Sequence, residues 1–302
     1  MTKRMTLIAA FVAIACLGGL AVAAAAQAQT TPPPKPPPAA PGAVQLRDGV
    51  YWIKGGAGAN TGFVIAKKEV VVIDAKMTED AAKAMQAEIR KLTPNPLKYI
   101  VLTHSDGDHV NGLSGFPKGL TIVAHANSKK DMEEAFKNPK LSALVPYLPT
   151  ETFPGNRRLN VSGVRTDLLY FGPAHTSGDV VVYLPGQKIA FIGDLAFTGR
   201  DPLIHRQKGG TSFGLVQVLK KILALNADTF ISGHSEPLKK ADLQALLTSI
   251  EEKQAKVKAL VQQGKSLDEI KSTFGVTDAP AQAAQRRPGF IEIIYLELTE
   301  KK

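Results

Sequence analysis

The sequence predicts an α/β protein in which two mixed β-sheets pack together and helices cover the outside of the pair. Strand-like runs come in groups along the chain, and helical patterns separate the groups. The run Val70–Ile73 is apolar at every position, which is typical of a strand buried on both faces. With 302 residues, of which 44% are hydrophobic and 21% charged, the chain has a globular composition and the length of one large domain or two ordinary ones.

The first 28 residues have the pattern of a secretory signal peptide. Lys3 and Arg4 precede an apolar run from Leu7 to Ala26, and Ala26-Gln27-Ala28 is a small-x-small cleavage pattern. An apolar run of this length could also anchor the chain in a bilayer, but its Ala- and Gly-rich composition favours cleavage near Ala28. We therefore expect a periplasmic or secreted protein with no stable membrane anchor after cleavage.

A Pro-rich linker is expected over residues 29–43, because the stretch Pro32–Pro38 favours extended polyproline II structure and has little to bury. Folded structure should begin near Val44. We expect the main domain over residues 44–238 and a C-terminal helical extension of the same domain over residues 239–302. Cys16 is the only cysteine, so the mature protein would hold any metal through nitrogen and oxygen.

Apolar and alternating runs predict the strands. They fall at Val50–Ile53, Thr61–Ile65, Val70–Ile73, Tyr99–Leu102, Thr121–Ala124, Asp167–Phe171, Val180–Leu184, Ile189–Ile192 and Thr229–Ile231. A Gly-rich turn over residues 55–60 joins the first two strands, and the polar residues 67–69 separate the second from the third.

Capping residues and the 3.6-residue apolar period predict the helices. Thr78 is a good N-cap for a helix that runs to about Leu92 and ends before Pro94. Further helices are expected at Ser128–Phe136, Ser212–Leu225, Lys239–Gln263 and Ser266–Phe274. The apolar segment Phe290–Leu298 fits a helix or a strand.

The net charge of the whole chain is +10, and removal of residues 1–28, which contain Lys3 and Arg4 but no acid, leaves +8. A basic surface suits anionic substrates, the cell envelope or nucleic acid. The chain has no repeat of interleaved aromatic and basic residues, so we expect no nucleic-acid partner. A solvated basic face on the C-terminal helices explains the charge more simply.

Four of the six histidines end a strand-like run or follow one closely, and acids accompany them. The histidines are His104, His109, His175 and His234, and the acids are Asp106, Asp108, Asp179 and Asp194. A tight turn around Gly107 could aim His104 and Asp106 at one metal ion and Asp108 and His109 at another. Each segment alone also fits a polar loop with structural histidines.

The four segments together resemble the metallo-β-lactamase superfamily. The resemblance rests on the order H-x-D-x-D-H at 104–109, G-x-x-H-T-x-G-D at 172–179, G-D at 193–194 and G-H at 233–234, and it covers roughly Val44 to Pro237. It implies an αββα sandwich with a metal site at one edge of the sheets. It also implies that His104, Asp106 and His175 hold one metal ion, that Asp108, His109 and His234 hold a second, and that Asp194 bridges the two. Asp74 would order the loops, and Thr176 and Asp179 would fix ligand orientation.

Asp106 departs from the family pattern, which has a histidine at this position. Three interpretations remain open: Asp106 ligates the first metal through oxygen, it lies beside a weak or vacant first site, or the site is damaged. Flavodiiron proteins share the fold, carry a glutamate at this position and bind two irons, but this chain has no flavodoxin-like region.

The ligand set implies two zinc ions, with iron or manganese as alternatives, that activate a shared water molecule. The expected function is hydrolysis of an ester, thioester, lactone or β-lactam, a small-molecule substrate in each case. Asp108 is the candidate catalytic side chain that orients the nucleophile or passes its proton on. A diiron redox protein and a non-catalytic metal-binding protein are the alternatives.

Three further segments lie outside the motifs. We expect His125 to have a structural role, and the alternative is that it lines the pocket. His205, in a basic loop after Asp194, is expected in a solvated loop, although it could contact an anionic substrate. The segment Pro139–Asn160 contains four prolines and is a candidate lid over the site.

Overall fold

The computed structural model describes residues 42–276 and 287–300, all within one compact unit. The predicted signal peptide and nearly all of the predicted linker lie outside the described residues. Among the described helices, none is both long and apolar enough to span a membrane.

The first sheet is mixed, and among the described residues it contains seven strands in the order β1-β2-β3-β4-β5-β6-β7. Their bounds are β1 (Val44–Arg47), β2 (Val50–Ile53), β3 (Thr61–Ile65), β4 (Val70–Ile73), β5 (Leu97–Val101), β6 (Thr121–His125) and β7 (Glu151–Phe153). The pairs from β1 to β4 are antiparallel, and those from β4 to β7 are parallel. All four residues of β4 are buried, as its uniformly apolar sequence predicts.

The second sheet is also mixed, with the order β12-β11-β10-β9-β8 among the described strands. Its strands are β8 (Arg157–Val161), β9 (Val164–Tyr170), β10 (Val180–Leu184), β11 (Ile189–Gly193) and β12 (Thr229–Ser232). Only β11 and β12 run parallel.

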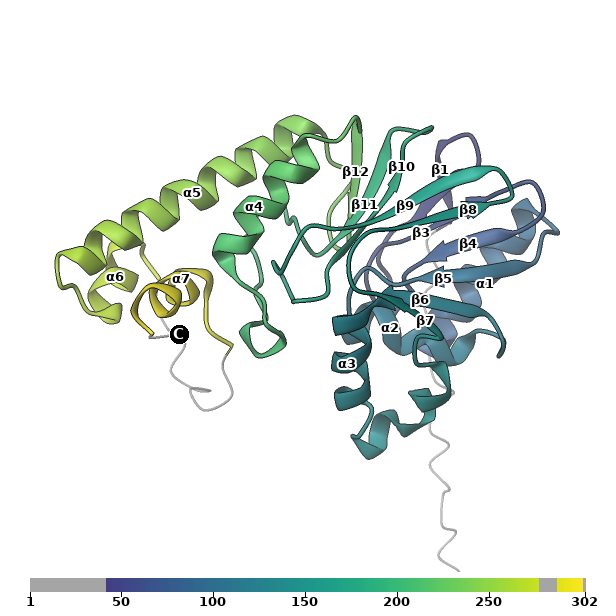
Figure 1. Cartoon of the computed structure of the whole chain (residues 1–302), viewed down its shortest axis with the longest axis horizontal. Coiled ribbons are helices and arrows are strands. Elements are labelled where there is room, and N and C mark those ends of the chain that lie inside the picture. The colour runs from purple at the N-terminus through teal and green to yellow at the C-terminus, as the bar shows by residue number, and fades with distance from the viewer. Residues whose placement is uncertain (1–41, 277–286, 301–302) are drawn as a thin grey trace, which may run out of the picture. The chain divides into compact units, whose positions relative to one another are not determined.

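The helices cover the outer faces of the two sheets (Figure 1). They are α1 (Glu79–Leu92), α2 (Gly107–Val110), α3 (Ala126–Ala135), α4 (Ser212–Leu223), α5 (Lys240–Gln262), α6 (Leu267–Thr273) and α7 (Phe290–Thr299), with the 3₁₀ helices η1 (Asn111–Gly115), η2 (Pro139–Tyr147) and η3 (Arg206–Lys208). Thr78 caps α1 by accepting a hydrogen bond from the backbone N–H of Ala81. The segment that fits either a helix or a strand by sequence is the helix α7.

Three apolar cores separate four layers. One core lies between the sheets and contains Val71 of β4 and Phe191 of β11. A second lies between the first sheet and α1 and α3. The third joins the second sheet to α4, α5, α6 and α7. This arrangement confirms the predicted αββα sandwich of two mixed sheets flanked by helices.

The expected lid over Pro139–Asn160 is wrong. Leu144 of η2 is buried with Leu113 of η1 in the core beside the first sheet. The strand β7 pairs with β6, and β8 pairs with β9. Short strands with polar side chains and interspersed prolines gave no clear period, so these two sheet edges could not be predicted from the sequence.

Gly62 of β3 allows the two sheets to approach closely. A Cβ at this position would lie 2.1 Å from the ring of Phe191, a side chain of β11 that is buried between the sheets. We expect Gly62→Ala to lower the free energy of unfolding by about 1–3 kcal/mol, because the ring has little room to move in a packed core.

Urea denaturation checks this expectation through the midpoint of unfolding. The matched control is Gly155→Ala, since no atom lies within 4 Å of a Cβ built there. The control should stay within about 0.5 kcal/mol of the parent. Equal midpoints for Gly62→Ala and the parent would contradict the packing argument.

Candidate metal centre

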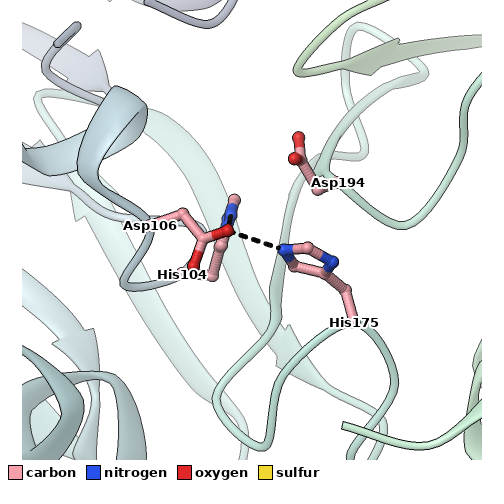
Figure 2. A group of neighbouring side chains, drawn as sticks. All are labelled: His104, Asp106, His175 and Asp194. Carbon is pink, nitrogen blue, oxygen red and sulfur yellow. Dashed lines mark hydrogen bonds and ion pairs between the residues drawn. The ribbon is translucent and has the colours of Figure 1, made fainter. Parts of the chain in front are cut away.

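A first group of four potential metal ligands gathers where strands of both sheets end. His104 and Asp106 follow β5, His175 lies between β9 and β10, and Asp194 follows β11. One ligand atom from each lies within 4.8 Å of the others. Figure 2 shows that these side chains converge from separate segments, with Asp106 facing the ring of His175. Nε2 of His175 lies 3.1 Å from Oδ2 of Asp106.

A second group consists of Asp108, His109 and His234, whose ligand atoms also lie within 4.8 Å of one another. The short helix α2 carries Asp108 and His109, and His234 follows β12. The side chains of Asp108 and His234 are 29% and 31% exposed, whereas His109 is fully buried. The second group is therefore open to solvent on one side.

Asp194 lies between the two groups. Its Oδ1 is 3.2 Å from Nε2 of His109, and its Oδ2 is 3.3 Å from Nε2 of His234. Gly233 permits this approach, because a Cβ there would lie 2.1 Å from Oδ1 of Asp194. From this position Asp194 could contribute a carboxylate oxygen to each group.

Several of these atoms have no hydrogen-bond partner. Among the described residues, Nε2 of His104, Nε2 of His109 and Oδ1 of Asp194 are buried without one, although the last two atoms lie 3.2 Å apart. A buried polar atom without a partner is costly, and native structures rarely leave one without a reason. Imidazole nitrogens and carboxylate oxygens are good ligands for divalent cations, so a bound cation would account for these atoms.

The Nδ1 atom of each buried histidine in the two groups has a hydrogen-bonding partner. Nδ1 of His109 lies 2.8 Å from Oδ2 of Asp74, and Nδ1 of His175 lies 2.7 Å from the carbonyl oxygen of Leu203. Nδ1 of His104 lies 3.1 Å from Oγ1 of Thr103. Each contact turns Nε2 towards the centre, as the outer partners of metal-bound histidines do.

The residues expected to order the loops lie behind the ligands. Asp74 accepts hydrogen bonds from the backbone N–H and the hydroxyl of Thr103. Asp179 accepts from the backbone N–H and the hydroxyl of Thr176, next to His175. Asp74 and Asp179 therefore hold the two histidine-bearing loops without pointing into either group.

When no cation is bound, protons on the histidines balance the negative charge of the carboxylates. Burial alone would lower the pKa of His109, but the charges of Asp194 and Asp74 raise it well above its usual value. Hydrogen bonds to Asp108 and Asp194 raise the pKa of His234 to about 9. Although burial opposes it, the charge on His109 holds the pKa of Asp194 well below its usual range.

Asp106 has two close neighbours that the sequence motifs do not predict. Nε2 of His205 lies 2.8 Å from Oδ2 of Asp106, and Nζ of Lys208 lies 2.7 Å from Oδ1. His205 is 2% exposed, so its expected placement in a solvated loop is wrong. The available signal was the departure at Asp106 itself, which adds a negative charge and removes a nitrogen donor that neighbouring residues must replace.

His125 lies outside both groups. Its ring stacks on Tyr170 with 4.0 Å between centroids, and its Nδ1 accepts from the backbone N–H of Asn127. This placement agrees with the structural role that the sequence favours.

A cation that takes the nitrogens of His109 and His234 must displace their protons. We therefore expect zinc binding at pH 7 to release protons, and the release to fall as the pH rises through about 9, where His234 loses its proton in the metal-free protein. Isothermal titration calorimetry in buffers of different ionisation enthalpy measures this release. Binding heats at pH 7 that do not depend on the buffer would contradict the charge balance described here.

The sequence is similar to that of known metal-dependent hydrolases and their relatives. A model of the metallo-β-lactamase superfamily matches residues 55–234. The alpha subunit of a 2,4-dinitroanisole O-demethylase from Nocardioides sp. is 25% identical over 179 residues, which are 58% of this chain and 52% of that protein. A hydroxyacylglutathione hydrolase from Rhizobium meliloti is 29% identical over 195 residues, which are 63% of this chain and 66% of that protein. The chain thus spans about half the length of the first relative.

A solved sec-alkylsulfatase from Pseudomonas sp. has a TM-score of 0.69 at 15% identity, over 86% of this chain and 50% of that one. At this level of identity, the likeness shows a shared fold. The family model covers more than half of the 302 residues and includes every residue of the two ligand groups. The chain belongs to the metallo-β-lactamase superfamily, as the order of its histidine and aspartate motifs implies.

Proposed function

We propose that the protein is an exported hydrolase that uses two divalent cations, zinc in the first instance, against an ester, thioester, lactone or β-lactam. The observation that carries the proposal is the pair of ligand groups joined by Asp194, with buried ligand atoms that lack other partners. Superfamily relatives that are hydrolases support the reaction class. The export part of the proposal rests on the signal-peptide pattern alone.

The residues of the two groups would have different roles. His104, Asp106 and His175 would hold one cation, and Asp108, His109 and His234 the other, with Asp194 shared. Cations held in this way would supply Lewis-acid chemistry, which lowers the pKa of a bound water molecule and stabilises a developing oxyanion. Asp108 lies on the solvent-exposed side, with Oδ2 3.1 Å from Nε2 of His234, where a carboxylate can orient the nucleophile and take its proton.

A cavity beside the second group supports a small-molecule substrate. It has a volume of about 620 Å³ and is lined by the loop after β11 and by one face of α5. Phe197 lines it and stacks on His234, with 5.8 Å between ring centroids. The guanidinium of Arg200 lies over the Phe197 ring, 4.0 Å from its centroid. Arg200 and Lys253 line the cavity together with Asp201 and Asp242, so its apolar wall carries charges of both signs and suits a small molecule with an apolar part and a polar group.

Iron is the second candidate cofactor, and the carboxylate of Asp106 is the observation that favours it. A donor set that is richer in oxygen suits iron as well as zinc. A diiron redox protein would contain iron after purification and absorb visible light, whereas a zinc hydrolase would be colourless.

The test is metal-dependent turnover on a panel that comprises a β-lactam, a lactone, a thioester, an aryl ester and a secondary alkyl sulfate, the last prompted by the sec-alkylsulfatase of like fold. We expect the zinc-loaded protein to hydrolyse at least one class and chelation to abolish the activity. Asp108→Asn should lower kcat by about 10²–10⁴-fold, because the neutral amide cannot take a proton.

Asp48→Asn is the matched control, since Asp48 lies exposed in the turn between β1 and β2, where asparagine fits equally well. This variant should keep full activity. A protein that binds two zinc ions but hydrolyses no member of the panel would favour the non-catalytic interpretation. Equal kcat values for Asp108→Asn and the parent would remove Asp108 from the mechanism.

A further inference from the structure

His205 lies beside the position where the family pattern lacks its usual histidine. It follows β11 in sequence and precedes η3, yet its Nε2 is 2.8 Å from Oδ2 of Asp106. Its ring meets the ring of His175 edge-on, with 4.7 Å between centroids. Three histidine rings, from residues 104, 175 and 205, therefore surround the carboxylate of Asp106, at Nε2–Oδ2 distances of 3.8, 3.1 and 2.8 Å.

Nε2 of His205 resembles Nε2 of His104 and of His109. It is buried without a hydrogen-bond partner among the described residues, although Oδ2 of Asp106 lies 2.8 Å away. Its Nδ1 is engaged, 3.0 Å from the side-chain amide of Gln207. Turned by 180°, that amide presents its oxygen to Nδ1–H and leaves the lone pair of Nε2 free for a cation.

Backbone hydrogen bonds hold His205 against the His175 loop. The N–H of His205 donates to the carbonyl of His175 at 2.8 Å. The carbonyl of His205 accepts from the N–H groups of Lys208 and Gly210 at 2.9 and 3.0 Å. These backbone hydrogen bonds fix the position of the His205 backbone, and the short histidine side chain then has few ways to place its ring.

Lys208 balances the charge that Asp106 introduces. Its Nζ lies 2.7 Å from Oδ1 of Asp106 and also donates to the carbonyl and hydroxyl of Ser105, at 3.2 and 3.1 Å. A histidine at position 106 would need no such counter-charge. His205 and Lys208 together restore a nitrogen donor and a neutral balance, which are the two properties lost with that histidine.

We propose that His205 is a ligand of the first cation, in the place of the histidine that the family pattern has at position 106, and that Lys208 holds Asp106 beside it. This proposal rests on the proposed dinuclear function. It replaces a vacant or damaged first site with one in which His104, His175 and His205 supply nitrogen and Asp106 supplies a carboxylate, with Asp194 still shared with the second site.

The experiment compares metal content and affinity in three proteins. His205→Gln keeps a side-chain N–H that can reach Asp106 but has no imidazole lone pair. We expect the parent to bind two zinc ions and His205→Gln one, with affinity at the first site weakened by about 100-fold or more in chelator competition. The matched control His125→Gln, which alters another buried histidine whose Nε2 lacks a partner, should keep both ions.

Each outcome separates the two proposals. Two ions in the parent and two in His205→Gln, with unchanged affinity, would overturn the ligand role and reduce His205 to a hydrogen-bond donor. Fewer than two ions in the parent would overturn the dinuclear function together with this ligand.

A rescue variant distinguishes loss of a metal ligand from loss of metal through misfolding. In the double variant Asp106→His/His205→Gln, the family's usual histidine is present, so the second ion should return. Circular dichroism establishes that each variant is folded, and cobalt absorption reports the nitrogen donors without any assay of activity. A folded double variant that still binds one ion would contradict the exchange of donors between positions 106 and 205.

Discussion

Seven ionisable side chains converge at one edge of the sandwich, and their mutual compensation of charge is the constraint on which the structure of the centre depends. Asp194 is the hub, because it contacts His109 and His234 of one group while it belongs to the other. Burial on this scale would be unfavourable for isolated charges. The ends of β5, β11 and β12 and the loop between β9 and β10 must therefore place partners within a few ångströms, and glycine at position 233 leaves room for them.

Most of the fold and of the centre could be predicted from local pattern. The apolar run of β4, the Thr78 cap of α1 and the motifs that follow the strands are signals within short segments of sequence. The edge strands β7 and β8 lacked such a signal, because they are short with mixed side chains, and Pro149 and Pro154 flank β7. His205 could not be placed because its burial depends on contacts with residues 106 and 175, which are far from it in sequence.

The surroundings of Asp106 compensate the charge of its carboxylate. The carboxylate contacts Lys208 and lies against three imidazole rings, so the first group is dense in donor atoms and close to charge balance. An added negative charge would weaken the first cation as a Lewis acid. The second group, with Asp108 and His234 partly exposed beside the Phe197 cavity, is then the side on which substrate would be expected to bind.

The most direct test of the account is anomalous diffraction from crystals of the protein purified without chelators, with data collected at the zinc absorption edge. We expect two peaks, one among His104, Asp106, His175 and His205 and the other among Asp108, His109 and His234, with Asp194 in contact with both. A single peak, or no peak at either group, would contradict a dinuclear centre.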